Sequence, residues 1–486
     1  MTKRYQSVKV NFIMNFILTI SNFIFPLITF PYASRVLGAS GVGTVTFASS
    51  IISYFSMIGM LGVPTYAIRA CAKIRDNQRK LEKTVQEIML LNIIVMLVAV
   101  VALAITVISI ERLNQERTLY LILSSTLIFN VLGVDWLYRA LERYSYITIR
   151  SIIFKFLALL LLLFLVKSSG DYVLYGAIGV VASVGSNFLN FINLRKIVSL
   201  KPTEKLDIRP HIKPSLTFFL LSVSTTIYLS VDTTLLGFMA NDEAVGYYSA
   251  AVKLKQILVG VVTSLGAVLL PRLSHYHEQG KHEEFNGLVQ KAINFIFVIA
   301  IPLMVYCILM AKDSILFLSG QSFLPAVLPM QFIMPTVLFI GLSNLMGIQV
   351  LVPTNREILV VYSTIVGAVV DIVLNVLLIP QMGASGTALA GSIAEFSVVI
   401  VQIYFLKDLI ITLLRKSSIT KVVLVTILAG SLTGLFRQIV SINPFVNLML
   451  TSVLFFGSYG LLLLLSGESF IQEVCQSLLR KIKYRN

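Results

Sequence analysis

The sequence predicts an all-α, polytopic membrane protein with about 14 transmembrane helices, a number set by how many apolar blocks can span a bilayer. Of its 486 residues, 57% are hydrophobic and only 13% are charged. An ordinary soluble domain carries roughly 25% charged residues. The apolar residues also fall in blocks of roughly twenty, the helix length that crosses ~30 Å of hydrocarbon. These observations exclude a soluble enzyme or a soluble binding module.

Each apolar block is assigned to one span. The predicted spans are Val10–Ser34, Thr44–Ala67, Glu87–Ile110, Thr118–Tyr138, Arg150–Val166, Val173–Leu194, Pro214–Met239, Tyr247–Pro271, Lys291–Met310, Leu324–Val352, Ile358–Ile379, Gly386–Leu406, Lys421–Ile442 and Val446–Ser466. An amphipathic piece after them, Phe470–Lys483, is expected to lie along the membrane surface.

The basic residues predict which side of the membrane each loop faces. With the N-terminus inside, 30 of the 39 Lys and Arg residues lie in inner segments and only 5 in outer loops. Cytoplasmic loops carry such an excess, so both termini are expected in the cytoplasm and the chain in the cytoplasmic membrane. The net charge of +16 is therefore assigned to topology and anionic lipid head groups, not to nucleic acid.

Known catalytic and metal-binding patterns are missing from the sequence. The three cysteines stand far apart, and the four histidines fall in hydrophilic connections, so neither a metal nor a cofactor is expected. There is no P-loop, GxSxG or HExxH pattern. Any uphill transport would then draw on an ion gradient or on substrate flux. Every outer loop is short, which disfavours an enzyme acting on outer-leaflet sugars.

Part of the sequence is repeated. Leu37–Ala48 (LGASGVGTVTFA) and Leu236–Ala250 (LGFMANDEAVGYYSA) share Leu-Gly, a spacer, Val-Gly and a later Ala, and Met382–Ala390 reuses GASG. The glycines suit tight outer turns and close helix packing. The spacing favours two pseudo-symmetric six-helix lobes, 1–207 and 208–407, with a helix pair and tail over 408–486. The alternative is that membrane hairpins favour Gly and Ala in any case.

Polar residues inside the spans are the candidate functional residues, because they are costly in hydrocarbon. Two helices carry a polar stripe that must face a cavity or another helix. The first comprises Asn11, Asn15, Thr19, Asn22, Pro26 and Thr29, and the second Ser249, Lys253, Gln256, Gly260 and Ser264. Lys155, about five residues into its span, is expected to snorkel towards the inner interface.

Counting residues from the outer turns matches two further pairs by depth. Asp232 and Lys253 both lie ~10 Å below the outer surface at 1.5 Å per residue, so an ion pair between these two residues is expected. Asp371 and Glu395 both lie ~14 Å deep, near the midplane. Two carboxylates at one depth repel when both are ionised, so this pair is suited to carry a proton or hold a sodium ion. The alternative is that they face different neighbours.

Phe25–Gly43 (FPLITFPYASRVLGASGVG), Gly62–Arg69 (GVPTYAIR) and Gly246–Ala250 (GYYSA) resemble polysaccharide-repeat-unit flippases of the Wzx type. These belong to the multidrug/oligosaccharidyl-lipid/polysaccharide (MOP) exporter superfamily, which includes the MATE transporters. The resemblance implies a V-shaped, two-lobed carrier of undecaprenyl-diphosphate-linked oligosaccharides that works by alternating access. It implies cationic contacts to the diphosphate and sugars from Lys253, Arg35 and Arg69. Related lipid II flippases carry several arginines in the first helix, whereas this span has none before Arg35.

The expected function is therefore a flippase that moves such repeat units to the outer leaflet for capsule, O-antigen, teichoic-acid or other surface polysaccharide assembly. The expected partners are the lipid-linked substrate, membrane lipids, H⁺ or Na⁺ as coupling ion, and polymerase and assembly proteins. The alternatives are an ion-coupled multidrug or cation exporter of the same superfamily and a membrane glycan polymerase or ligase. The predicted substrate contacts are Arg35, Lys253, Arg69, Asn11, Asn15, Asn22 and Gln256, and the predicted coupling residues are Asp232, Asp371 and Glu395.

Overall fold

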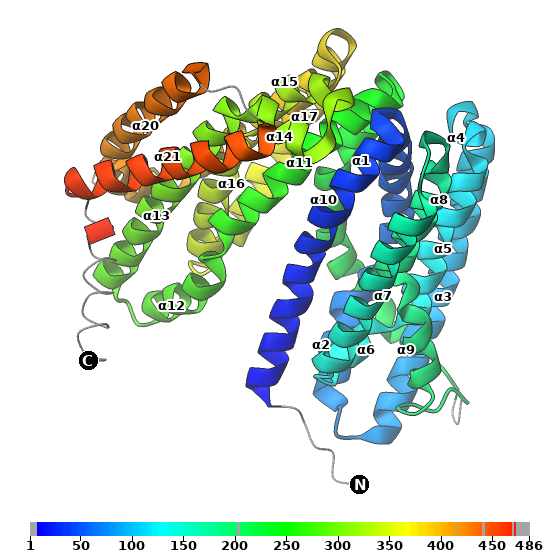
Figure 1. The fold of residues 1–486 in the computed structure, drawn as a ribbon. Helices are drawn as coiled ribbons and strands as arrows, with labels where there is room; N and C mark the ends of the chain where they lie inside the picture. The colour runs from blue at the N-terminus through cyan, green and yellow to red at the C-terminus, as the bar shows by residue number, and fades with distance from the viewer. Residues whose placement is uncertain (1–6, 202–204, 416, 440–442, 469–470, 473–486) are drawn as a thin grey trace, which may run out of the picture. The chain divides into compact units, whose positions relative to one another are not determined.

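A computed structural model of the chain describes residues 7–201, 205–415, 417–439, 443–468 and 471–472. All regular secondary structure in these residues is helical (Figure 1). A helix bonds its backbone N–H and C=O groups within one segment, which is what a lipid environment requires. The all-α prediction is confirmed. The predicted amphipathic piece Phe470–Lys483 lies outside the described residues except for 471–472.

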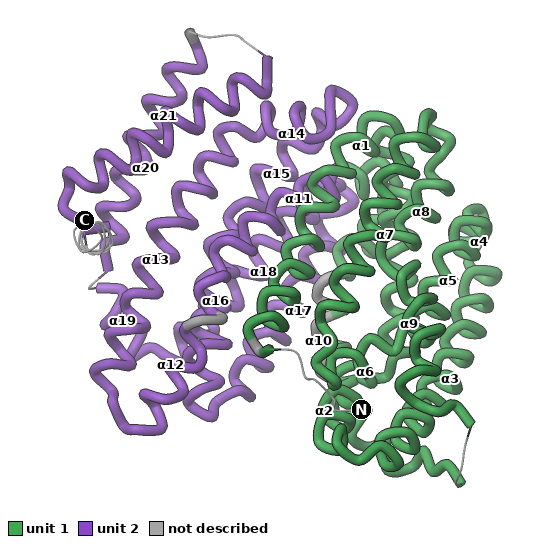
Figure 2. The backbone as a smooth tube through the Cα atoms, turned by 60° about the horizontal axis from the view of Figure 1, so that its bottom comes forward, with its two compact units in different colours: residues 1–246 green, residues 247–486 purple. Residues whose placement is uncertain are grey.

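The chain divides into two compact units, Met1–Gly246 and Tyr247–Asn486 (Figure 2). The division falls inside one helix, α11 (Asp242–Thr263). The predicted lobe boundary lies at residue 207, before helix α10 (Arg209–Met239). By its contacts, however, α10 belongs to the first unit, where it packs against α1 (Val8–Met60). The division into 1–207, 208–407 and 408–486 stays a prediction.

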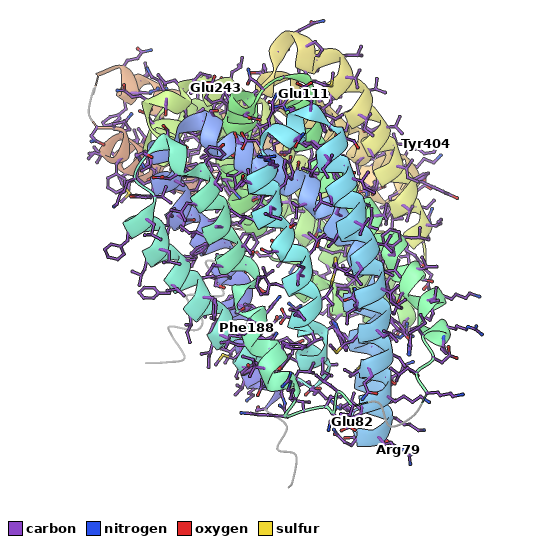
Figure 3. The ribbon with its side chains drawn as sticks, turned by 90° about the vertical axis from the view of Figure 1, so that its right-hand side faces the viewer. Arg79, Glu82, Glu111, Phe188, Glu243 and Tyr404 are labelled. Atoms are coloured by element: carbon purple, nitrogen blue, oxygen red, sulfur yellow. The ribbon has the colours of Figure 1, made fainter. Side chains whose placement is uncertain are left out.

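The described part of the first unit contains twelve regular elements before α11. They are α1, α2 (Val63–Ile74), α3 (Gln78–Ser109), α4 (Glu111–Gln115), α5 (Arg117–Gly133), α6 (Asp135–Ala140), α7 (Tyr144–Leu165), η1 (Ser169–Asp171), α8 (Tyr172–Val180) with the π-turn η2 (Val181–Gly185), α9 (Asn187–Leu194) and α10. Figure 3 shows Arg79 and Glu82 at one end of this unit and Glu111 at the other. The two ends of α3 therefore open onto loops that the charge pattern assigns to opposite sides of the membrane.

Helix α1 holds the first two predicted spans. Gly38 interrupts it with φ 70° and ψ −177°, a conformation that glycine adopts at little steric cost. Two helical segments therefore meet at Gly38, which is the second residue of the first copy of the repeated sequence. Helix α2 continues the second span after Leu61 and Gly62, and Pro64 suits its first turn because a proline lacks only an N–H that is unbonded there.

The second unit continues from α11 to the end of the described chain. It contains α12 (Gly266–Glu278), α13 (His282–Leu309), α14 (Ala311–Ser319), η3 (Gln321–Ala326), α15 (Val327–Ile333), α16 (Thr336–Asn344), η4 (Leu345–Leu351), α17 (Glu357–Met382), α18 (Ala384–Phe405), α19 (Lys407–Arg415), α20 (Ile419–Ile439) and α21 (Pro444–Leu465). Helices α17 and α18 form a hairpin that turns at Gly383 (φ 52°), and α20 and α21 lie side by side (Figure 1).

The helices have the length and surface of membrane spans. Within the described residues, ten helices are long and apolar enough to cross a bilayer, and one bent pair adds an eleventh. The first of them, Lys9–Ile74, counts once although Gly38 divides it. Large apolar side chains such as Phe164 and Leu465 are 73% and 75% exposed, as expected for side chains that contact lipid. The polytopic prediction is confirmed, and about 14 spans stays a prediction compatible with these helices.

Candidate functional site

The polar stripe predicted on the first span lies on α1, beside α7 (Figure 1). Asn11 is buried, whereas Asn15 and Asn22 are exposed on the surface of the protein. The hydroxyl groups of Thr19 and Thr29 donate to backbone oxygens one turn earlier in the same helix. These threonines are satisfied within α1, so the asparagine side chains are the groups left to bind a neighbour or a ligand.

Lys155 on α7 binds this stripe. Its Nζ donates to Ser21 Oγ at 2.7 Å and to Asn22 Oδ1 at 2.5 Å. The side chain is buried, so the prediction that Lys155 snorkels to the interface is wrong. Two neutral oxygens hold the ammonium in place, and no carboxylate among the described residues forms an ion pair with it. The site therefore has a positive charge that its protein partners do not neutralise.

Of the two arginines predicted to bind substrate in the first unit, Arg35 lies away from this cluster. Arg35 is exposed, thirteen residues beyond Asn22 on α1, or ~20 Å at 1.5 Å per residue, and its Nη1 donates to the Pro31 carbonyl oxygen at 2.8 Å. Arg69 is exposed on α2. The structure therefore brings Asn22 to Lys155 and not to Arg35. Their roles in binding stay predictions.

The second predicted stripe begins the second unit. Lys253 is half-buried and Gln256 exposed on α11. Asp232 is half-buried on α10, in the first unit. The predicted ion pair between Asp232 and Lys253 would join the two units, and it stays a prediction.

Asp371 and Glu395 lie on the two helices of the α17–α18 hairpin and are 4% and 8% exposed. Asn375, one turn after Asp371, donates from Nδ2 to Asp371 Oδ1 at 3.2 Å. The depth count therefore locates two buried carboxylates on helices that pack against each other. Their part in coupling stays a prediction.

The repeated sequences pack directly against each other. A Cβ at Gly43 would overlap the carbonyl oxygen of Asp242, and a Cβ at Gly246 would overlap the carbonyl oxygen of Ala39. Only glycine permits this approach of the two backbones, as in small-residue contacts between membrane helices. The close packing predicted from the repeated glycines is confirmed at these two positions.

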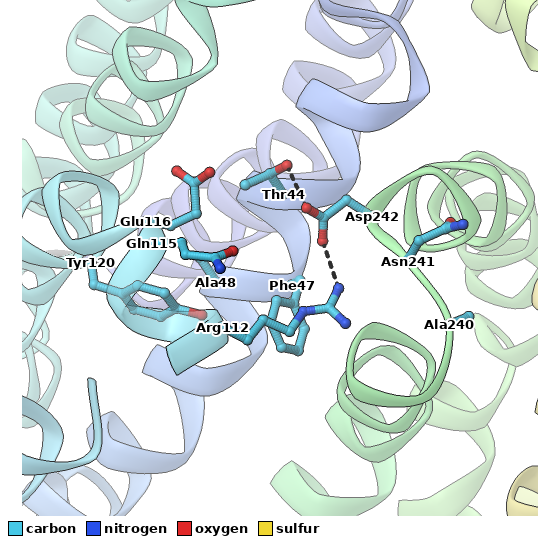
Figure 4. A pocket seen from close by; sticks show the side chains of 10 residues that line it. All are labelled: Thr44, Phe47, Ala48, Arg112, Gln115, Glu116, Tyr120, Ala240, Asn241 and Asp242. Atoms are coloured by element: carbon cyan, nitrogen blue, oxygen red, sulfur yellow. Dashed lines mark hydrogen bonds and ion pairs between the residues drawn. The ribbon is translucent and has the colours of Figure 1, made fainter. Parts of the chain in front are cut away.

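An ion pair lies beside this glycine contact (Figure 4). Arg112 Nη2 donates to Asp242 Oδ1 at 3.0 Å, and Thr44 Oγ1 donates to Asp242 Oδ2 at 3.1 Å. The charge pattern of the sequence identifies Arg112 only as an outer-loop base and gives Asp242 no role. The signal that could have identified Asp242 is its place inside the second copy of the repeat.

A second cluster joins α2, α3 and α10 at the end of the unit where the basic loops lie. His211 is buried, with Nδ1 at 2.6 Å from the Tyr66 hydroxyl and Nε2 at 3.0 Å from Glu87 Oε2. The backbone N–H of Asp207 donates to the other oxygen of Glu87 at 3.0 Å. The prediction that all four histidines lie in connections is wrong. His211 occupies the first turn of α10, His275 and His277 lie in the last turn of α12, and His282 begins α13.

The chain is similar to known membrane proteins. A family model described as "Polysaccharide biosynthesis protein" matches residues 8–277. A relative from Shigella dysenteriae, named "Putative O-antigen transporter", is 26% identical over 412 residues, which cover 82% of this chain and 99% of the relative.

Two solved structures share the fold. The lipid II flippase MurJ, in an inward closed conformation, matches with a TM-score of 0.73 at 16% identity and covers 92% of this chain and 97% of its own. An inward-facing MATE family transporter of the MOP superfamily matches with a TM-score of 0.63 at 14% identity. The match covers 81% of this chain and 96% of the MATE chain. The family match covers more than half of the chain. Because the relative and both solved structures are named as transporters or flippases, the alternative of a membrane glycan polymerase or ligase is set aside. The chain belongs to the polysaccharide biosynthesis protein family and is a multi-pass membrane transporter with the fold of the MOP superfamily.

Proposed function

We propose that the chain moves an undecaprenyl-diphosphate-linked oligosaccharide from the inner to the outer leaflet of the cytoplasmic membrane. The family match and the relative named as an O-antigen transporter support this substrate class. A polyprenyl tail can stay in the bilayer, whereas a diphosphate-sugar head group cannot cross ~30 Å of hydrocarbon unaided. The protein's task is to provide a polar path for the head group alone.

The observation that carries the proposal is the un-neutralised charge of Lys155. An ammonium that is held by Ser21 and Asn22 keeps its charge available to an anion, because neutral oxygens orient it without cancelling it. A diphosphate would supply the missing negative charge, and charge-assisted bonds are the stronger hydrogen bonds in proteins. The asparagine side chains of the α1 stripe would then bind sugar hydroxyls.

Alternating access is the proposed mechanism, with both termini in the cytoplasm. The Gly43–Gly246 contact and the Arg112–Asp242 pair are proposed to close the path at its predicted outer end. Opening to the outside would require these contacts to separate.

Asp232, Asp371 and Glu395 are proposed to couple the cycle to H⁺ or Na⁺. Lys253, Gln256 and the two exposed arginines are proposed as further head-group contacts along the path. A polymerase and other assembly proteins are proposed as partners.

The test is translocation in proteoliposomes. Purified protein is reconstituted with a fluorescent undecaprenyl-diphosphate oligosaccharide, and a membrane-impermeant quencher reports the labelled lipid on the outer side. We expect protein-dependent exchange of the lipid-linked sugar between leaflets and no efflux of a cationic dye under an imposed H⁺ or Na⁺ gradient. Dye efflux without lipid exchange would contradict the proposal and favour the multidrug-exporter alternative.

A further inference from the structure

A cavity lies beside the Arg112–Asp242 pair in the first unit. It has a volume of about 320 Å³, at the lower end of the ~300–1,000 Å³ range of small-molecule sites. It is lined by Thr44, Phe47, Ala48, Arg112, Gln115, Glu116, Tyr120, Ala240, Asn241 and Asp242 (Figure 4). These residues come from α1, from α4, α5 and the residue between them, from the turn after α10, and from the first residue of α11. The cavity is thus at the predicted outer end, away from Lys155.

One group in the cavity is buried without a partner. The Tyr120 side chain is 3% exposed, and its hydroxyl forms no hydrogen bond with any described residue. Leaving a buried polar group unbonded is unfavourable, so a partner outside the described chain would stabilise this position. Figure 4 shows the Tyr120 hydroxyl and the Gln115 amide both directed towards the space beside Arg112.

The charges of the lining disfavour a phosphate. Arg112 is the one basic residue among the ten, its Nη2 is bonded to Asp242, and its guanidinium lies 4.9 Å from the centre of the Phe47 ring. Glu116 adds a second carboxylate and accepts a hydrogen bond from the Tyr172 hydroxyl at 2.9 Å. With one cation against two carboxylates, the cavity repels an anion. It is therefore unlike the Lys155 cluster, which we propose binds the diphosphate.

The remaining lining groups suit a sugar ring. The Gln115 amide can donate and accept at once, and the Tyr120 hydroxyl can do the same, as a polyhydroxylated ligand requires. We propose that this cavity binds one uncharged sugar residue of the oligosaccharide head group at the outer end of the transporter. This inference rests on the proposed function and adds a second contact point on the same substrate.

The test uses the oligosaccharides that mild acid releases from the lipid-linked pool of the producing cells. Saturation-transfer NMR measures their contact with the purified, detergent-solubilised transporter. We expect transfer to sugar ring protons with the wild type. In the Gln115→Ala, Tyr120→Phe double variant, affinity should fall roughly tenfold, because two hydrogen bonds are lost. The matched control, Tyr175→Phe, removes a hydroxyl on α8 that does not line the cavity and should bind as the wild type does.

Either no transfer with the wild type or equal transfer in the double variant would overturn the cavity assignment. The same preparations are assayed for exchange of the intact lipid-linked substrate. If the wild type exchanges the lipid but shows no saturation transfer to the sugar, the assignment of the cavity as a sugar site is wrong and the proposed flippase function is still supported. If the wild type exchanges no lipid, the proposed function itself fails. Single variants Gln115→Ala and Tyr120→Phe serve if the double variant does not fold.

Discussion

Gly43 and Gly246 hold equivalent places in the two repeated sequences, and each faces the carbonyl oxygen four residues before the other. Gly43 faces Asp242, and Gly246 faces Ala39. The contact is therefore reciprocal, as expected when two copies of one segment meet about a local two-fold axis. This arrangement explains why both copies retain Val-Gly at the same place: each glycine admits the backbone of the other copy.

Alanine at either glycine should prevent closure of the outer end. In Gly43→Ala or Gly246→Ala the new methyl group would overlap backbone atoms, which cannot move aside as a flexible side chain can. We expect normal membrane insertion, loss of lipid exchange, and faster labelling of Thr44→Cys by a membrane-impermeant maleimide in a background without other cysteines. Gly179→Ala is the control, because a Cβ there meets nothing within 4 Å. Wild-type exchange in both glycine variants would refute the closure.

Removing the Arg112–Asp242 pair should weaken closure only slightly. The two side chains are 29% and 31% exposed, and partly exposed ion pairs contribute only about 0.2–1 kcal/mol. Arg112→Ala should therefore raise Thr44→Cys labelling by no more than roughly fivefold. The charge swap Arg112→Asp with Asp242→Arg should restore part of the protection, whereas Glu243→Gln, an exposed neighbour, should have no effect. If the swap labels faster than Arg112→Ala, the pair does not hold the outer end closed.

His211 should stabilise the fold by bonding the buried Glu87 carboxylate and the half-buried Tyr66 hydroxyl. His211→Ala removes one hydrogen bond from the Glu87 carboxylate and one from the Tyr66 hydroxyl, at a cost of about 1–3 kcal/mol in the free energy of unfolding. We expect a lower thermal midpoint in size-exclusion chromatography of the heated, detergent-solubilised protein. His282→Ala, at the exposed start of α13, is the control. Equal midpoints for the two variants would show that the cluster adds no stability.

The sequence predicts the fold because the membrane constrains each segment separately. Span length follows from bilayer thickness and loop sidedness from local basic residues, so neither needs knowledge of distant contacts. The depth count likewise locates Asp371 and Glu395 on one hairpin, because the hairpin turn fixes their relative height.

The candidate site depends on contacts between segments far apart in the chain. Lys155 and Asn22 are 133 residues apart, and Arg112 and Asp242 are 130 apart. Wheel geometry gives the direction of a side chain but not the helix that it meets. Sequence rules treat each residue type alone and do not consider the side chains that it binds in the fold. They therefore predict Lys155 at the membrane interface and His211 in a connection between spans.

The carboxylates of the α17–α18 hairpin should affect coupling rather than substrate binding. Asp371→Asn is expected to slow exchange under an imposed H⁺ or Na⁺ gradient while lipid-linked substrate still binds. The double variant with Glu395→Gln should be no slower than the more damaged single variant, because residues acting as one unit are not additive. Glu357→Gln, at the exposed start of α17, is the control. Unchanged gradient dependence in both single variants would place any coupling ion elsewhere.

The central claim is that the buried Lys155 ammonium binds the diphosphate head group, and one substitution tests it most directly. Lys155→Met keeps the length of the side chain and removes its charge, and exchange of the fluorescent lipid-linked oligosaccharide is measured in proteoliposomes. We predict exchange slower by roughly 10- to 100-fold, since hydrogen bonds to charged groups contribute about 1.5–3 kcal/mol, with part of the rate restored by Lys155→Arg. Lys167→Met, an exposed lysine just beyond the same helix, should leave the rate unchanged. Exchange by Lys155→Met at the wild-type rate would contradict the claim.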